Sequence, residues 1–245
     1  MHYQLVIDPS DVEAVRHVYK ESMSHPIVEG RLERNTAFPI PQLNNEDFWR
    51  TQIMCLLTTQ NKSGTGSAVD VFLQTQPFPL SLEECKTSEE LDKLITSTFS
   101  RLRIRRWKIS ADFLQQNFLI LEQGGWGKLE LWRDHLLEQR ITVAEPIHYL
   151  FEREVAQGTQ ELLRGFGPKQ SRNFWQDLGL FRYEIPLDSR ILRWLKSRLE
   201  FFIPSSGLTD EKFYSQVMDN VRELAINAGV LPCILDAAIF ASYEQ

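Results

Sequence analysis

Apolar residues recur at helical spacing in several stretches of the chain, with polar residues between them. Trp107, Ala111, Leu114 and Phe118 lie at i, i+4, i+7 and i+11, which places them on one face of an α-helix. Similar spacing predicts helices that carry Trp49–Leu57, Leu129–Leu136, Ile191–Leu199, Phe213–Leu224 and Ile234–Tyr243. Strand signals are few, so the sequence predicts an all-α, mainly helical fold.

Capping residues precede several of these stretches. Asn44, Asp188 and Asp210 each stand just before an apolar series, and such side chains accept hydrogen bonds from the free N–H groups of a first helical turn. Thr87 and Glu90 have the spacing of a capping box. These positions predict where four helices begin.

The stretch from Gln157 to Leu199 has the clearest local pattern. It predicts a short helix, a Gly-Phe-Gly turn at Gly165–Gly167, and a second helix that begins at Pro168 and ends near Gly179. Glycine suits a sharp turn, and proline suits the first helical turn. An extended link and a third helix opened by Asp188 follow.

Composition is that of an ordinary globular protein. The 245 residues are 42% hydrophobic and 24% charged, enough to bury a substantial core. No apolar run approaches the roughly 18 residues of a membrane span, and the first residues lack a signal-peptide pattern. Three widely spaced cysteines favour a reducing compartment. We therefore expect an intracellular protein, cytoplasmic (nucleoid-associated) or nuclear, that is neither secreted nor membrane-bound.

Positive charge is concentrated in two segments although the net charge is −6. Arg164–Arg198 holds eight basic and three acidic residues, and Arg101–Lys108 holds five basic residues. Local charge of this kind favours a phosphate-bearing partner. Solvated helix faces are the alternative interpretation.

Patterns of other site classes are incomplete. Gly64-Thr65-Gly66 lacks the third glycine of a dinucleotide-binding turn, and Gly124–Lys128 lacks the Ser or Thr of a P-loop. The five histidines have no metal-binding spacing.

Two motifs of the Gln157–Leu199 stretch together resemble a known family. They are Leu163-x-Gly165-Phe166-Gly167-x-Lys169 and Pro186-Leu187-Asp188-Ser189-Arg190, with 19 residues from Lys169 to Asp188. This combination resembles the helix-hairpin-helix and catalytic aspartate of the HhH-GPD superfamily of DNA glycosylases. The segment Lys169–Leu195 is most similar to the 8-oxoguanine glycosylase branch, and weaker similarity covers Phe48–Ser63 and Ser100–Leu114.

The resemblance implies two helical lobes with a cleft between them and the helix-hairpin-helix at the cleft mouth. One lobe would be residues 48–188, ending in the motif at about 157–180. The other would join residues 1–47 to 189–245.

The resemblance also implies a base-excision repair enzyme, a DNA glycosylase with AP lyase activity. Lys169 would attack C1′ of a damaged nucleotide, with 8-oxoguanine the favoured lesion, and a Schiff base would lead to β-elimination. Asp188 would stabilise the positive charge that develops at C1′. The substrate would be double-stranded DNA with a damaged base or an abasic site.

Further roles follow from the same resemblance. Gln60 would fill the gap left by a flipped base, with Asn61 beside it. The other implied DNA contacts are Gly165, Phe166, Gly167, Arg172, Arg190, Arg105 and Arg106. The backbone carbonyls of Glu161, Leu163 and Phe166 would hold a monovalent cation.

Three alternatives stay open at the level of sequence. They are an oxidised-pyrimidine glycosylase/lyase of the endonuclease III type, a glycosylase without lyase activity, and a non-catalytic helix-hairpin-helix protein that binds DNA. Endonuclease III carries an iron–sulfur cluster near its C-terminus, where this chain has only Cys233. Three cysteines cannot supply four thiolates, so we expect no cluster and no other cofactor, in a monomer.

Overall fold

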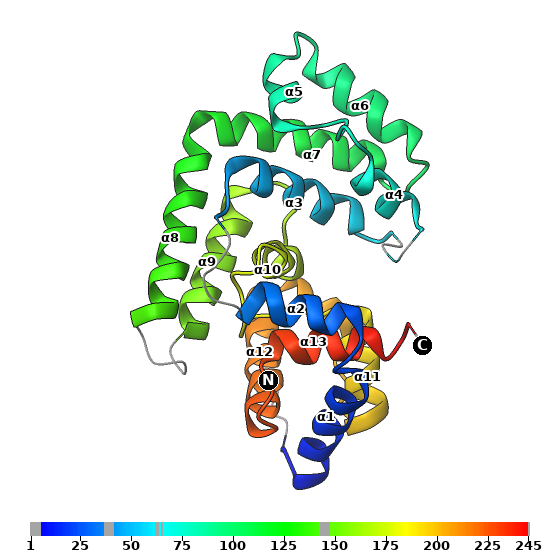
Figure 1. The fold of residues 1–245 in the computed structure, drawn as a ribbon, viewed down its shortest axis with the longest axis vertical. Coiled ribbons are helices and arrows are strands. Elements are labelled where there is room, and N and C mark those ends of the chain that lie inside the picture. Colours follow the sequence, from blue (N-terminus) through cyan, green and yellow to red (C-terminus); the bar gives the residue numbers. More distant parts are fainter. Residues whose placement is uncertain (1–5, 37–41, 62–63, 65, 143–147, 245) are drawn as a thin grey trace. The chain divides into compact units, whose positions relative to one another are not determined.

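The computed structural model describes residues 6–36, 42–61, 64, 66–142 and 148–244. Figure 1 shows helices joined by turns, and none of these residues lies in a strand. The all-α prediction is therefore confirmed. Contacts between Cα atoms group the chain into two compact units, which we call the first and second units.

The first unit comprises Met1–Pro41, Asp134–Gly158 and Gly167–Gln245. Its helices are α1 (Pro9–Ser22), α2 (Pro26–Thr36), α10 (Pro168–Asp177), α11 (Ser189–Leu199), the 3-10 turn η3 (Ser205–Thr209), α12 (Glu211–Asn227) and α13 (Pro232–Ala241). Their apolar faces form one core, in which Val15, Trp194, Tyr214, Val217 and Leu235 are almost fully buried. Burying such side chains is the main stabilising contribution to a helical unit.

The second unit comprises Gln42–Arg133 and Thr159–Phe166. Its helices are α3 (Asn45–Thr58), α4 (Ala68–Gln74), α5 (Leu82–Thr87), α6 (Leu91–Arg101), α7 (Trp107–Ile120) and the π-helical turn η1 (Leu121–Gly125). Trp49 packs edge-on against Phe118, and Phe72 packs edge-on against Phe99. Helices α8 (Trp126–Thr142) and α9 (His148–Leu162) contribute residues to both units.

The boundaries predicted for two lobes, at residues 47 and 188, stay a prediction. In the contact grouping, α10 belongs with α11, α12 and α13. The segment Gly167–Asp188 therefore shares its unit with the C-terminal helices.

Three of the four predicted helix starts are confirmed. Asn44, Asp188 and Asp210 each accept a hydrogen bond from a backbone N–H of the helix that follows. The capping box at Thr87 is wrong. Thr87 is the last residue of α5, and its hydroxyl donates to the Glu83 carbonyl, a bond that the spacing to Glu90 does not reveal.

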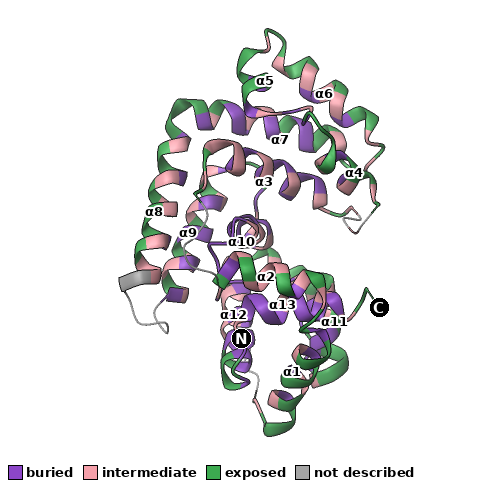
Figure 2. Ribbon diagram, viewed as in Figure 1, coloured by how far each residue is buried: buried purple, intermediate pink, exposed green. Residues whose placement is uncertain are grey.

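Most residues of α13 are buried in the core of the first unit. Figure 2 shows α13 almost wholly buried, whereas α11 has one exposed side. Among the helices that the structure describes, no single one is long and apolar enough to cross a membrane. Only α12 and α13 taken together, bent by 89°, meet the criteria of length and composition.

Candidate functional site

Lys169 is the second residue of α10 in the first unit. Gly167 is the N-cap with an extended backbone and no side-chain cap, and Pro168 fills the first helical position as predicted. The Lys169 side chain is half-buried. Lys169 thus lies in the first turn of α10, where the backbone N–H groups have no partner within the helix.

Asp188 caps α11 in the same unit. Its Oδ1 accepts from the N–H groups of Arg190 and Ile191 at 2.8 and 3.0 Å. Its Oδ2 accepts from Nε of Arg190 at 2.9 Å. The Arg190 guanidinium also lies 3.7 Å from the centre of the Phe240 ring. The predicted catalytic carboxylate thus has a fixed orientation and one cationic partner.

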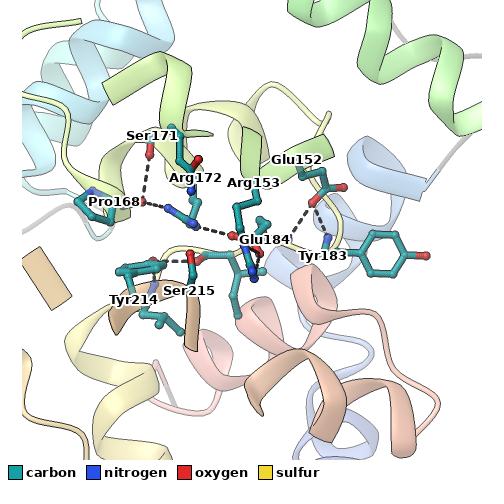
Figure 3. A network of polar contacts seen from close by, with 12 residues as sticks. Glu152, Arg153, Pro168, Ser171, Arg172, Tyr183, Glu184, Tyr214 and Ser215 are labelled. Atoms are coloured by element: carbon teal, nitrogen blue, oxygen red, sulfur yellow. Dashed lines mark hydrogen bonds and ion pairs between the residues drawn. The ribbon is translucent and has the colours of Figure 1, made fainter. Parts of the chain in front are cut away.

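Tyr214 connects the helix of Lys169 to the backbone that leads into Asp188. Its hydroxyl accepts from the Leu187 N–H at 2.6 Å and donates to the Ile185 carbonyl at 2.9 Å. Its ring lies 4.3 Å from the guanidinium carbon of Arg172, three residues after Lys169 on α10. The helix of Lys169 and the segment that leads into Asp188 are therefore both joined to one buried polar network, in which Figure 3 shows Arg172 and Tyr214.

Arg172 is fully buried within that network. Its Nε donates to Glu184 at 2.7 Å, its Nη2 to Glu211 at 2.7 Å and its Nη1 to the Pro168 carbonyl at 3.0 Å. Burial is the largest single influence and lowers the pKa of Arg172, but the charge of Glu184, the hydrogen bond to Glu211 and the charges of Tyr214 and Glu211 together raise it. Because the guanidinium is inaccessible and already bound, Arg172 does not fit its predicted contact with DNA. It instead holds the first turn of α10.

Glu184 is the centre of the same network. Besides Arg172, it accepts from Arg153 at 2.8 Å and from Arg222 at 3.4 Å, and its side chain has no exposed area. Arg153 and Arg222 also pair with Asp219. A buried carboxylate needs such partners because its desolvation is costly.

Glu152 on α9 binds the backbone of residues 182–184, in the link between α10 and α11. Its two carboxylate oxygens accept from the N–H groups of Arg182, Tyr183 and Glu184, each at 2.8 Å. Burial raises the pKa of Glu152 to about 7, and the three N–H donors oppose that shift. The link between α10 and α11 is thus tied at both ends, by Glu152 and by Tyr214.

Asp236 on α13 is a second carboxyl group near Asp188. Burial raises the pKa of Asp236 to about 6, Arg31 lowers it, and the charge of Asp188 raises it further. Gln176 of α10 donates to Asp236 at 3.1 Å. Helix α10 is therefore also joined to α13 beside the cap of α11.

In the second unit, Asn61 joins the loop after α3 to the segment before α7. Its Oδ1 accepts from the Arg105 N–H at 2.9 Å, and its Nδ2 donates to the Leu57 carbonyl at 2.8 Å. Gln60 is exposed and has a left-handed backbone with φ of 61°. Arg105 and Arg106 are also exposed. The structure thus brings four predicted DNA contacts of this unit into two adjoining segments.

The turn that contains Gly165 packs against the same region. The Arg164 N–H donates to Oδ1 of Asn117, and the Asn117 amide donates to the Arg164 carbonyl at 3.0 Å. Gly165 has φ of +81°, and a Cβ there would lie 2.5 Å from the Phe113 ring. Only glycine fits this conformation and this close approach. A small pocket adjoins the turn, lined by Leu56, Thr59, Arg106, Ile109, Ser110, Phe113 and Gly165.

The predicted cation ligands are the last residues of α9 and the turn after it. Leu163 and Phe166 are buried and Glu161 is exposed. Their role rests on backbone carbonyls and stays a prediction. In the described ranges of the chain, no group of three or more His, Cys, Asp or Glu side chains could hold a metal ion.

Sequence reasoning missed Tyr214, Glu184 and Asn117. Their hydrogen-bond partners lie 27, 12 and 47 residues away. Local sequence patterns do not predict contacts between residues so far apart in the chain. The one available signal was an excess of arginines in Arg164–Arg198, which requires carboxylate partners wherever an arginine becomes buried.

No protein-family model matches the chain, and no curated protein matches it.

Proposed function

We propose that the protein is a DNA glycosylase with AP lyase activity, acting on an oxidised base in duplex DNA. The observation that supports this most is the attachment of α10, which carries Lys169, and of the Asp188 cap to one buried network through Arg172 and Tyr214. Catalysis by two groups requires that neither drifts relative to the other. A protein that only held DNA would need neither this lysine nor this carboxylate.

In the proposed reaction the neutral amine of Lys169 attacks C1′ of the damaged nucleotide. The glycosidic bond breaks, and the base leaves with the bonding electrons and gains a proton. The fixed charge of Asp188 stabilises the oxocarbenium-like state. The C1′–O4′ bond of the sugar then opens, the amine proton passes to O4′, and a Schiff base forms between Lys169 and C1′. Loss of a C2′ proton follows, and the C3′–O bond breaks with departure of the 3′-phosphate.

Borohydride trapping tests this proposal, because it reduces a Schiff base to a stable covalent adduct. The protein is incubated with duplexes that carry 8-oxoguanine, thymine glycol, uracil or an abasic site. We expect an adduct that is absent in Lys169→Gln and present in Lys212→Gln. Lys212 is the matched control, since it is likewise the second residue of its helix, α12.

The outcomes also separate the alternatives. Trapping on thymine glycol rather than 8-oxoguanine would indicate an oxidised-pyrimidine enzyme. Base release without strand scission would indicate a glycosylase without lyase activity. Duplex binding with no adduct on any of the four duplexes, the abasic one included, would overturn the lyase and leave a DNA-binding protein.

Asp188→Asn separates the charge of this residue from its capping role. Asparagine caps helices about as well as aspartate, so we expect stability close to that of the native protein. Loss of the fixed anion should slow trapping by roughly a hundredfold. A native trapping rate in this variant would remove Asp188 from the mechanism.

A further inference from the structure

Helix α11 has a concentration of positive charge that the proposed chemistry does not use. Its 11 residues include four cations, Arg190, Arg193, Lys196 and Arg198, and no acidic residue. The whole chain has a net charge of −6, so the residues outside α11 carry −10. A helix with this charge in an acidic protein needs a physical explanation.

Three of the cations form a row, each beside an aromatic ring. Arg190, Arg193 and Lys196 are three residues apart, which places them next to one another on a helix. Arg193 lies 5.3 Å from the centre of the Tyr243 ring, and Lys196 lies 5.5 Å from that of Phe202. Phe202 is 58% exposed and Tyr243 is 38% exposed. The row begins beside Asp188, with which Arg190 is paired.

Arg193 and Lys196 lack a carboxylate partner among the residues that the structure describes. Both are exposed, and within the described part of the chain no ion pair involves either of them. This differs from Arg153, Arg172 and Arg222, whose guanidinium groups are all bound by carboxylates. The charges of Arg193 and Lys196 are therefore available to an external anion.

We propose that Arg193 and Lys196, with the rings of Tyr243 and Phe202 beside them, form a binding surface for the sugar-phosphate backbone of duplex DNA. This rests on the proposed function only in naming DNA as the polyanion. From Arg190 to Lys196 the row spans about 9 Å of helix, and duplex DNA carries one phosphate charge about every 1.7 Å of its axis. Each ring limits the motion of its cation, so less conformational freedom is lost on binding.

The apolar side of α11 favours nucleic acid over a membrane surface. Ile191, Trp194 and Leu195 are buried in the core of the first unit. A helix that lies in a membrane interface needs its apolar face free to enter the lipid. Here only the cationic face is available.

Salt dependence of binding tests this surface. The dissociation constant of an undamaged duplex is measured between 50 and 400 mM salt for the native protein and for Arg193→Gln/Lys196→Gln. Each lost phosphate contact lowers the slope of log K against log salt by about 0.9. We therefore expect a slope smaller by about 1.8 and roughly tenfold weaker binding at 0.1 M salt.

Lys20→Gln/Lys212→Gln is the matched control. It removes two charges from exposed positions of the same unit and should leave the slope unchanged. Native affinity and slope in Arg193→Gln/Lys196→Gln would overturn the proposal. A second outcome would also overturn it: the native protein binds vesicles of anionic phospholipid but not duplex DNA, and the double variant loses the vesicle binding.

Borohydride trapping on a saturating abasic duplex distinguishes this surface from the proposed function. If Arg193→Gln/Lys196→Gln is trapped normally but keeps the native salt slope, the surface fails and the lyase stands. If the native protein is never trapped but the double variant loses slope as expected, the lyase fails and the surface stands.

Discussion

Arg172 on α10 and Arg193 on α11 come from one basic stretch of sequence and have opposite environments. Arg172 is fully buried and bound by Glu184 and Glu211, whereas Arg193 is exposed beside Tyr243. The first arginine maintains the fold and the second is free to bind an external anion. Positive charge in a sequence therefore predicts a phosphate contact only after buried ion pairs have been subtracted.

The largest expected effect is on stability. Arg172→Ala leaves the buried Glu184 with fewer partners, and breaking a buried ion pair costs about 3–5 kcal/mol. Arg193→Ala removes an exposed side chain and should change the free energy of unfolding by less than about 0.5 kcal/mol. Urea denaturation measures both. Equal losses in the two variants would contradict the division into buried and available arginines.

A pH effect of similar size is expected from Glu152. Its pKa is raised to about 7 from 4.5, so its contribution to stability is fully present below about pH 4.5 and is lost as the pH rises through 7. The loss approaches roughly 3 kcal/mol by pH 8. Glu152→Gln cannot titrate at this position. Its free energy of unfolding should therefore rise relative to that of the native protein as the pH increases from about 4.5 to about 8. A difference independent of pH would show that Glu152 is ionised throughout.

Tyr214→Phe tests how the buried network positions Asp188. The variant leaves the buried Leu187 N–H without an acceptor, which costs about 1–3 kcal/mol. We expect slower borohydride trapping with native duplex affinity, because the variant disturbs positioning and not the binding surface. Tyr19→Phe is the control: Tyr19 packs partly buried against the core of the same unit, and the variant should change neither quantity. Weaker duplex binding by Tyr214→Phe at an unchanged trapping rate would contradict a positioning role.

The smallest effect is expected at the end of α11. Glu200 is the exposed C-cap of this helix, and its charge opposes a phosphate at the neighbouring Lys196. Glu200→Gln should strengthen duplex binding by about twofold, the size of a charge–charge interaction across several ångströms of water. Weaker binding in equilibrium titrations would place the DNA elsewhere.

Local features of the fold were predictable from the sequence. Asp188 and Asp210 cap the helices that follow because an N-cap needs only its own next three residues. The capping box predicted at Thr87 was wrong because the Thr87 hydroxyl donates to the Glu83 carbonyl within α5. The spacing from Thr87 to Glu90 contains no information on that bond.

The network of the candidate site was not predictable. Whether an arginine is buried depends on Glu184 and Glu211, which lie 12 and 39 residues from Arg172. The sequence treats Arg172 and Arg190 alike, as basic residues beside a motif. Packing distinguishes them, and it also introduces Tyr214 and Asn117, whose partners are equally distant.

The most direct test of the central claim is the identity of the residue that forms the Schiff base. The native protein is trapped on an abasic duplex with borohydride, digested, and analysed by mass spectrometry for the peptide that carries the sugar remnant. The remnant is predicted on Lys169, in the first turn of α10. A remnant on another lysine, or on the N-terminal amine, would contradict the assignment of this site.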